Sequence, residues 1–134
     1  MMTTDYDVND VNDKTLTPRL MKGKKDIFFG TLNVQTLQKV GKVHELIASA
    51  EATNQDIICV QEHRSTHDTQ TTMVHSYGNW RLITCSAWKN SVNATIGGIG
   101  MLFSPEAFKA LASVDMITPR IMIATLNGNP QTIV

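Results

Sequence analysis

Two polar residues follow apolar segments at the points where those segments end. Asn33 ends the β-branched and aromatic run 27–33, and Glu62 ends the apolar run 56–62. A carboxylate placed directly after a buried strand needs a cation or solvent beside it. Carboxylate and amide oxygens are ligands for hard cations such as Mg²⁺. The pair therefore indicates metal chemistry, although the ordinary roles at these positions are an exposed strand end for Glu and a turn or cap for Asn.

The segments around these two residues are predicted to form a strand-helix-strand unit. The runs 27–33 and 56–62 suit short strands, the first of them buried on both faces. Between them, apolar residues recur at spacings of three and four, which predicts an amphipathic helix that ends near Asn54. Such a unit joins parallel strands whose carboxyl ends lie at one edge of the sheet. Because neighbouring strands lie about 4.8 Å apart, we expect Asn33 and Glu62 to approach within about 7 Å. The apolar positions of the helix are Leu37, Val40, Val43, Leu46, Ile47 and Ala50.

The rest of the chain is predicted to contain one long loop and several further elements. The segment 63–77 is rich in Thr, Ser and His, which indicates a surface loop. Ser104 followed by Pro105 marks the start of a helix that runs to Leu111, with Ser104 as its N-cap. The other expected elements are strands at 80–85, 96–103 and 120–126, a two-residue type I′ turn at Asn127-Gly128, and a returning strand from Gln131.

Composition and charge exclude several classes of protein. A chain of 134 residues, 42% of them hydrophobic, is long enough for one domain with a core. Twelve basic and twelve acidic residues balance, which argues against a histone-like polycation or an acidic tail but allows a nucleic-acid enzyme with a local basic patch. No segment approaches the ~18 apolar residues of a membrane span, and residues 1–10 do not resemble a signal peptide. We expect an intracellular protein of the nucleus or cytoplasm, without a membrane partner.

The chain divides into a polar leader and a folded domain. Residues 1–25 are polar and without period, which predicts a flexible leader; the alternative is a basic arm that contacts nucleic acid. The folded domain is expected to occupy residues 26–134. Within it, Cys59 and Cys85 each lie in an apolar run and are predicted to be buried, reduced thiols.

Four segments of this domain resemble the endonuclease/exonuclease/phosphatase superfamily, and especially the apurinic-type endonuclease domains of non-LTR retrotransposons. The resemblance covers residues 27 to 134. It implies an α/β fold of the α+β type, the N-terminal half of a DNase-I-like four-layered sandwich with mixed sheets. It also implies hydrolysis of phosphodiester bonds in DNA with Mg²⁺ or Mn²⁺. The segments are GTLNVQTL at 30–37, GK at 41–42, DIICVQEHR at 56–64 and GGIG at 97–100.

The resemblance assigns roles to four residues. Glu62 matches the family's metal-binding carboxylate, and Asn33 matches the Asn that orients the metal and the scissile phosphate. His63 and Arg64 follow that carboxylate and are candidate contacts to the substrate phosphate, although both also suit ordinary surface positions.

The later motifs of the family lie beyond the end of this sequence. A Y-x-P motif, a D-x-N pair and the block with the base-orienting Asp-His dyad are not present before Val134. We therefore expect an N-terminal fragment that binds Mg²⁺ weakly and is inactive alone, because the residues of such a site act as a unit. A complementing C-terminal half or self-association would cover its exposed sheet. The alternatives are a non-catalytic interaction module and the product of a decayed mobile element.

Two further patterns do not match known motifs. His63 and His67 do not form H-E-x-x-H and have no Cys pair beside them, so a zinc site is not expected. Gly97, Gly98 and Gly100 fit neither G-x-G-x-x-G nor a P-loop, and instead indicate close strand packing or a bulge.

Overall fold

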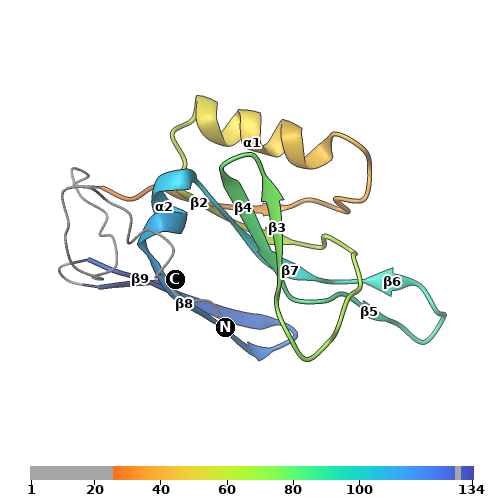
Figure 1. Ribbon diagram of the computed structural model, residues 1–134. Coiled ribbons are helices and arrows are strands. Elements are labelled where there is room, and N and C mark those ends of the chain that lie inside the picture. The colour runs from red at the N-terminus through yellow and green to blue at the C-terminus, as the bar shows by residue number, and fades with distance from the viewer. Residues whose placement is uncertain (1–25, 129–130) are drawn as a thin grey trace.

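The computed structural model describes residues 26–128 and 131–134, which form a mixed α+β arrangement of sheets with two helices (Figure 1). The predicted leader, residues 1–25, lies outside the described residues. The helices are α1 (Lys42–Ala52) and α2 (Pro105–Ala110). The strands are β1 (Phe29–Asn33), β2 (Ile57–Gln61), β3 (Met73–Tyr77), β4 (Trp80–Thr84), β5 (Trp88–Lys89), β6 (Thr95–Ile96), β7 (Ile99–Phe103), β8 (Leu111–Thr118), β9 (Ile121–Leu126) and β10 (Thr132–Ile133).

A five-stranded mixed sheet positions the candidate residues. Its order is β1-β2-β7-β4-β3, and β1 and β2 are parallel while the other pairs are antiparallel. The strand-helix-strand prediction for β1, α1 and β2 is therefore confirmed. A second sheet has the order β10-β9-β8, and β5 pairs with β6 in a separate hairpin. Neither helix in the described part of the chain is long and apolar enough to cross a bilayer.

Two hydrophobic clusters lie on opposite faces of the five-stranded sheet. One face packs against α1, whose buried residues include Leu46 and Ala50. The other face packs against α2 and the three-stranded sheet, as Figure 1 shows. Side chains of β2 alternate between them, with Ile57 in the second cluster and Ile58 in the first. This alternation follows from the period of two along a strand.

The exposure of β1 corrects one prediction. Among the described residues β1 pairs only with β2, so it is an edge strand and is not buried on both faces. Phe29 is 45% exposed and Leu32 is 46% exposed. The predicted helix also begins too early, because its apolar positions include Val40. In the structure α1 begins at Lys42, after Gly41, which has φ +83°. Val40 is therefore fully exposed in the preceding turn.

Three other expectations differ from the structure. The predicted loop 63–77 contains β3, which pairs with β4 as a hairpin. Strand β8 was not predicted, and its pairing with β9 is interrupted by two register shifts. The prediction of a two-residue turn at Asn127-Gly128 is wrong, because Leu126 pairs with Thr132 and the connection between them, 127–131, has five residues. The Asn127 N–H instead donates to the Ala110 carbonyl at 2.7 Å.

The local predictions have different outcomes, and the cap of the second helix is confirmed. Ser104 caps α2, and its Oγ accepts from the Ala107 N–H at 3.1 Å. The single strand predicted at 96–103 is wrong, because Gly97-Gly98, both with positive φ, divide the run into β6 and β7. Cys59 and Cys85 are free thiols, fully buried at Cys85 and half-buried at Cys59, and burial raises the pKa of both.

Candidate functional site

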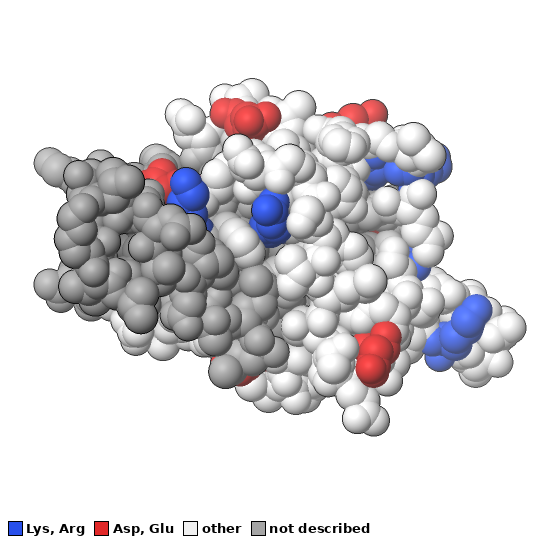
Figure 2. All heavy atoms as spheres, in the orientation of Figure 1, with Lys and Arg blue, Asp and Glu red and all other residues white. Residues whose placement is uncertain are grey.

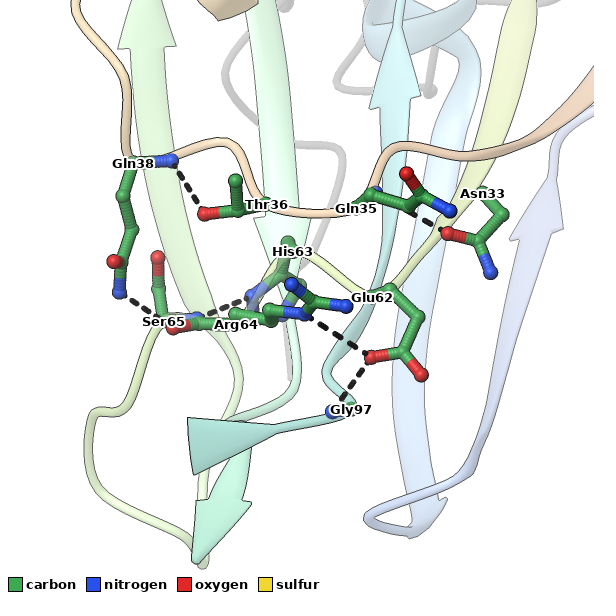
Figure 3. Close-up of polar contacts among 9 residues, drawn as sticks. All are labelled: Asn33, Gln35, Thr36, Gln38, Glu62, His63, Arg64, Ser65 and Gly97. Carbon is green, nitrogen blue, oxygen red and sulfur yellow. Dashed lines mark hydrogen bonds and ion pairs between the residues drawn. The ribbon is translucent and has the colours of Figure 1, made fainter. Parts of the chain in front are cut away.

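Asn33 and Glu62 lie at the same end of two neighbouring strands. The parallel register pairs Asn33 with Gln61, the last residue of β2, so Glu62 follows one residue beyond that pair. Figure 3 shows both side chains at the carboxyl ends of β1 and β2, a part of the sheet that we call the β1–β2 edge. The shared edge is the arrangement that the strand-helix-strand pattern predicts.

The Glu62 carboxylate is held by the loop that precedes β7. Its Oε2 accepts the Gly97 N–H at 2.9 Å and lies 3.7 Å from Nε of Arg64 (Figure 3). The Glu62 side chain is 35% exposed. No hydrogen bond within residues 26–128 and 131–134 involves Oε1 of Glu62. The carboxylate thus has one oxygen fixed by the backbone and one able to bind a cation.

Main-chain hydrogen bonds tie the segment after β2 to loops on both sides. On one side, the N–H groups of Thr36 and Leu37 donate to the carbonyls of Glu62 and His63, at 2.7 and 3.1 Å. On the other side, the Arg64 N–H donates to the Gly97 carbonyl at 3.0 Å. These bonds hold an unusual backbone, since the φ of Glu62 is +62° and that of Thr36 is +93°. Each such residue costs on the order of 1–3 kcal/mol, which the surrounding contacts must offset.

His63 is buried and does not reach the surface. It is 1% exposed, its Nε2 lies 2.7 Å from the Cys85 carbonyl, and its Nδ1 accepts the Ser65 N–H at 3.0 Å. A ring that accepts at Nδ1 and donates at Nε2 is neutral, and burial lowers its pKa. The expectation of an exposed loop residue is wrong, because the ring fills the space left by the absent side chain of Gly98. Both ring nitrogens are engaged within the protein, so His63 supports the loop.

Arg64 lies beside the Glu62 carboxylate and is 41% exposed. Its Nε is buried without a hydrogen bond in the described part of the chain. The side chain as a whole is partly exposed, and its two Nη groups make no hydrogen bond among the described residues, so they are able to bind another oxygen group at this edge. A phosphate is one such group.

The Asn33 side chain has a structural contact of its own. Its Oδ1 accepts the Gln35 N–H at 3.2 Å, which forms a turn at the end of β1. Asn33 also lines a pocket of about 380 Å³ between β1 and α1, together with Lys42 and Glu45. Glu62 does not line this pocket. The two candidate residues thus share an edge, and each is oriented by a different loop.

The described residues supply few ligands for a metal ion. Within residues 26–128 and 131–134, no group of three or more His, Cys, Asp or Glu side chains could hold one. Mg²⁺ binds about six oxygens and keeps several waters. Glu62 and Asn33 have the oxygen ligands that such an ion prefers, and water or phosphate would complete its coordination.

A second polar cluster lies between β3 and β4 and was missed in the sequence. The Nε2 atoms of His67 and His75 each lie 3.1 Å from Oγ1 of Thr84. Nδ1 of His67 donates to the Asp68 carbonyl, so Nε2 of His67 accepts from Thr84, and Thr84 in turn accepts from His75. Burial lowers the pKa of His75, with a further contribution from His67. No sequence signal links these residues without the β3–β4 pairing.

Charge is distributed without a large patch on the face seen in Figure 2. Acidic and basic side chains are scattered over that face. Neither a scan against protein-family profiles nor a search of curated protein sequences finds a match to this chain.

Proposed function

We propose that this chain provides the metal-binding edge of a Mg²⁺- or Mn²⁺-dependent phosphodiesterase that acts on DNA, in a DNase-I-like fold. The observation that carries the proposal is the Glu62 carboxylate, held at the end of β2 by the Gly97 N–H with one oxygen free of hydrogen bonds in the described part of the chain. The neighbouring position of Asn33 supports it. The resemblance of the surrounding motifs supplies the reaction and substrate class.

The roles of the individual residues are those that the resemblance implies, and their contacts are compatible with them. Glu62 would hold the cation through its carboxylate, and Asn33 would orient the metal and the scissile phosphate. Arg64 contacts a phosphate oxygen from its place beside the carboxylate. A bound divalent ion stabilises the charge that develops on the phosphate and the leaving oxygen. His63 has no direct part in this proposal, because both its ring nitrogens are engaged.

The proposed site is incomplete in its protein ligands. One carboxylate and one amide supply two of about six oxygens, so the chain is expected to bind Mg²⁺ weakly. Arg64 next to Glu62 opposes cation binding further by charge repulsion. We propose that the chain alone is inactive and that cleavage requires residues from a complementing segment.

Metal binding is the direct test. Mn²⁺ titrated into the purified chain and followed by electron paramagnetic resonance should show weak binding that Glu62→Gln removes. Glu51→Gln, which neutralises an exposed carboxylate on α1, is the matched control and should leave binding unchanged. Equal Mn²⁺ binding by wild type and Glu62→Gln would overturn the site.

Plasmid cleavage tests the second part of the proposal. Supercoiled DNA incubated with the chain and Mg²⁺ should remain intact. Nicking that Glu62→Ala abolishes would contradict inactivity and support the metal site. Nicking that persists in Glu62→Ala would contradict both.

A second candidate function is a non-catalytic interaction module, and the exposure of β1 favours it. Phe29 and Leu32 are each close to half exposed on a strand that has one neighbour among the described residues. An edge strand with apolar side chains pairs readily with another chain. Its partner would be a complementing segment or a second copy.

A further inference from the structure

The hydrogen bond that holds Glu62 depends on where the Gly97 N–H lies. Gly97 is packed against Trp88. A Cβ added at Gly97 would lie 2.3 Å from Cη2 and 2.5 Å from Cζ3 of Trp88. These are outer atoms of the six-membered ring. Gly97 also has φ +75°, which disfavours any other residue. The indole ring thus lies directly against the backbone that donates to the carboxylate.

Trp88 is in turn held by the second sheet. The guanidinium carbon of Arg120 lies 4.8 Å from the centroid of the Trp88 ring, a cation–π contact. Arg120 precedes β9, in the turn that joins β8 to β9. Trp88 begins β5 and pairs with Ile96, the residue before Gly97. Both the hairpin pairing and the arginine therefore restrict the ring.

We propose that Trp88, held by Arg120, is a positioning residue for the Glu62 carboxylate. It acts through Gly97: the ring keeps the Gly97 N–H directed at Oε2 of Glu62. This inference rests on the proposed function for what the carboxylate binds, but the positioning itself has a separate measurement. It gives the β8–β9 turn a part in the site, although its residues do not contact Glu62 directly.

The chemical shift of the Gly97 amide is the first measurement. In the ¹⁵N-labelled chain, Glu62→Gln should move the Gly97 amide resonance, because the acceptor loses its charge. Trp88→Phe should also move it and, independently of the changed ring current, should speed its exchange with deuterium, since the shorter Phe ring does not fill the place of the outer indole atoms that lie against Gly97. Trp80→Phe is the matched control: Trp80 is buried in the cluster under α1, and its loss should leave Gly97 unchanged.

The arginine provides a milder pair of variants. Arg120→Ala should move the Gly97 resonance in the same direction as Trp88→Phe by a smaller amount. Arg120→Lys, which keeps a cation over the ring, should restore most of the wild-type position. An unchanged Gly97 amide in Trp88→Phe, in a chain where Glu62→Gln moves it, would overturn the proposal.

Mn²⁺ affinity is the second measurement, and it separates this inference from the proposed function. Trp88→Phe should weaken Mn²⁺ binding about tenfold although every proposed ligand remains, whereas Trp80→Phe should not. If wild type binds no Mn²⁺ while Trp88→Phe speeds the exchange of the Gly97 amide with deuterium, the positioning role stands and the proposed function fails. Full Mn²⁺ affinity in Trp88→Phe would overturn the positioning role.

Discussion

Gly98 lies against the imidazole ring of His63. A Cβ added at Gly98 would stand 2.4 Å from Cε1 of His63 and 2.7 Å from each ring nitrogen. The ring is hydrogen-bonded on both sides and buried, so it has no space into which it could move. The glycine therefore allows the segment after β2 to lie hydrogen-bonded alongside the segment that precedes β7, and Glu62 is placed by that pairing.

Gly98→Ala should destabilise the chain strongly. The substitution combines a left-handed backbone, φ +92°, with a steric clash, for a loss of about 3 kcal/mol in the free energy of unfolding. Gly41→Ala is the control, because φ there is +83° and no atom lies within 4 Å of the added Cβ; it should cost about 1–2 kcal/mol. Urea denaturation measures both, and equal losses would contradict the packing of His63.

Stability should fall as the solution is acidified below the ordinary histidine pKa. Burial lowers the pKa of His63 and of His75 in the folded chain, whereas in the unfolded chain both titrate near 6.5. The unfolded state therefore binds more protons once the pH drops below 6.5. The contribution of these neutral rings is complete above that value and is lost as the pH falls toward the folded pKa values.

Urea denaturation between about pH 8 and about pH 5.5 checks this dependence. His63→Gln should be less stable than wild type at high pH, and it should lose less stability on acidification. His44→Gln, at an exposed position of α1, should retain the wild-type dependence. A wild-type stability that does not change over this range would contradict the prediction.

Ser104→Ala should remove the cap of α2. The Ser104 hydroxyl accepts the Ala107 N–H, and its loss should cost about 1 kcal/mol of unfolding free energy. Ser49→Ala, at an exposed position within α1, should change stability by less than about 0.5 kcal/mol. The two variants can be compared by thermal unfolding, where similar midpoints would argue against the cap.

Leu32→Lys should reduce self-association. If copies of the chain meet through the exposed edge of β1, a charged side chain on that edge opposes their pairing. Because Leu32 is 46% exposed, the substitution should change the stability of a single copy only slightly. Sedimentation velocity over a range of concentrations should show wild type forming dimers or larger species, and Leu32→Lys should remain monomeric.

Val40→Lys is the control for this experiment. Val40 is fully exposed but lies outside the strands, so the variant should associate as wild type does. A wild type that stays monomeric at every concentration would contradict self-association through β1 and would leave a complementing segment as the only proposed partner.

The parts of the fold that could be predicted are those where local pattern and packing agree. Strand β2 is a short apolar run, and α1 buries Val43, Leu46 and Ala50 at helical spacing. Strand β3 was missed because it lies at the edge of its sheet with all five of its residues at least partly exposed, so it lacks an apolar period. Strand β8 was missed because register shifts after Leu111 and Met116 break the alternation along it.

The site could likewise be predicted only where it follows from local pattern. The common edge of Asn33 and Glu62 follows from the strand order, which local sequence determines. The burial of His63 does not, because the ring needs Gly98, which lies 35 residues later, to make room for it. The contact of Gly97 with Trp88 likewise depends on the β5–β6 pairing.

The alternation of β2 between the two hydrophobic clusters also bears on how the molecule opens. Ile57 and Ile58 are consecutive residues that belong to different clusters, and Met101 and Leu102 on β7 are divided in the same way. Opening either layer would expose one face of both β2 and β7, so the clusters should lose structure together as one cooperative unit. The backbone amides of β2 and β7 should accordingly exchange with deuterium more slowly than those of β1 and β3, which can fray at the margins of the sheet.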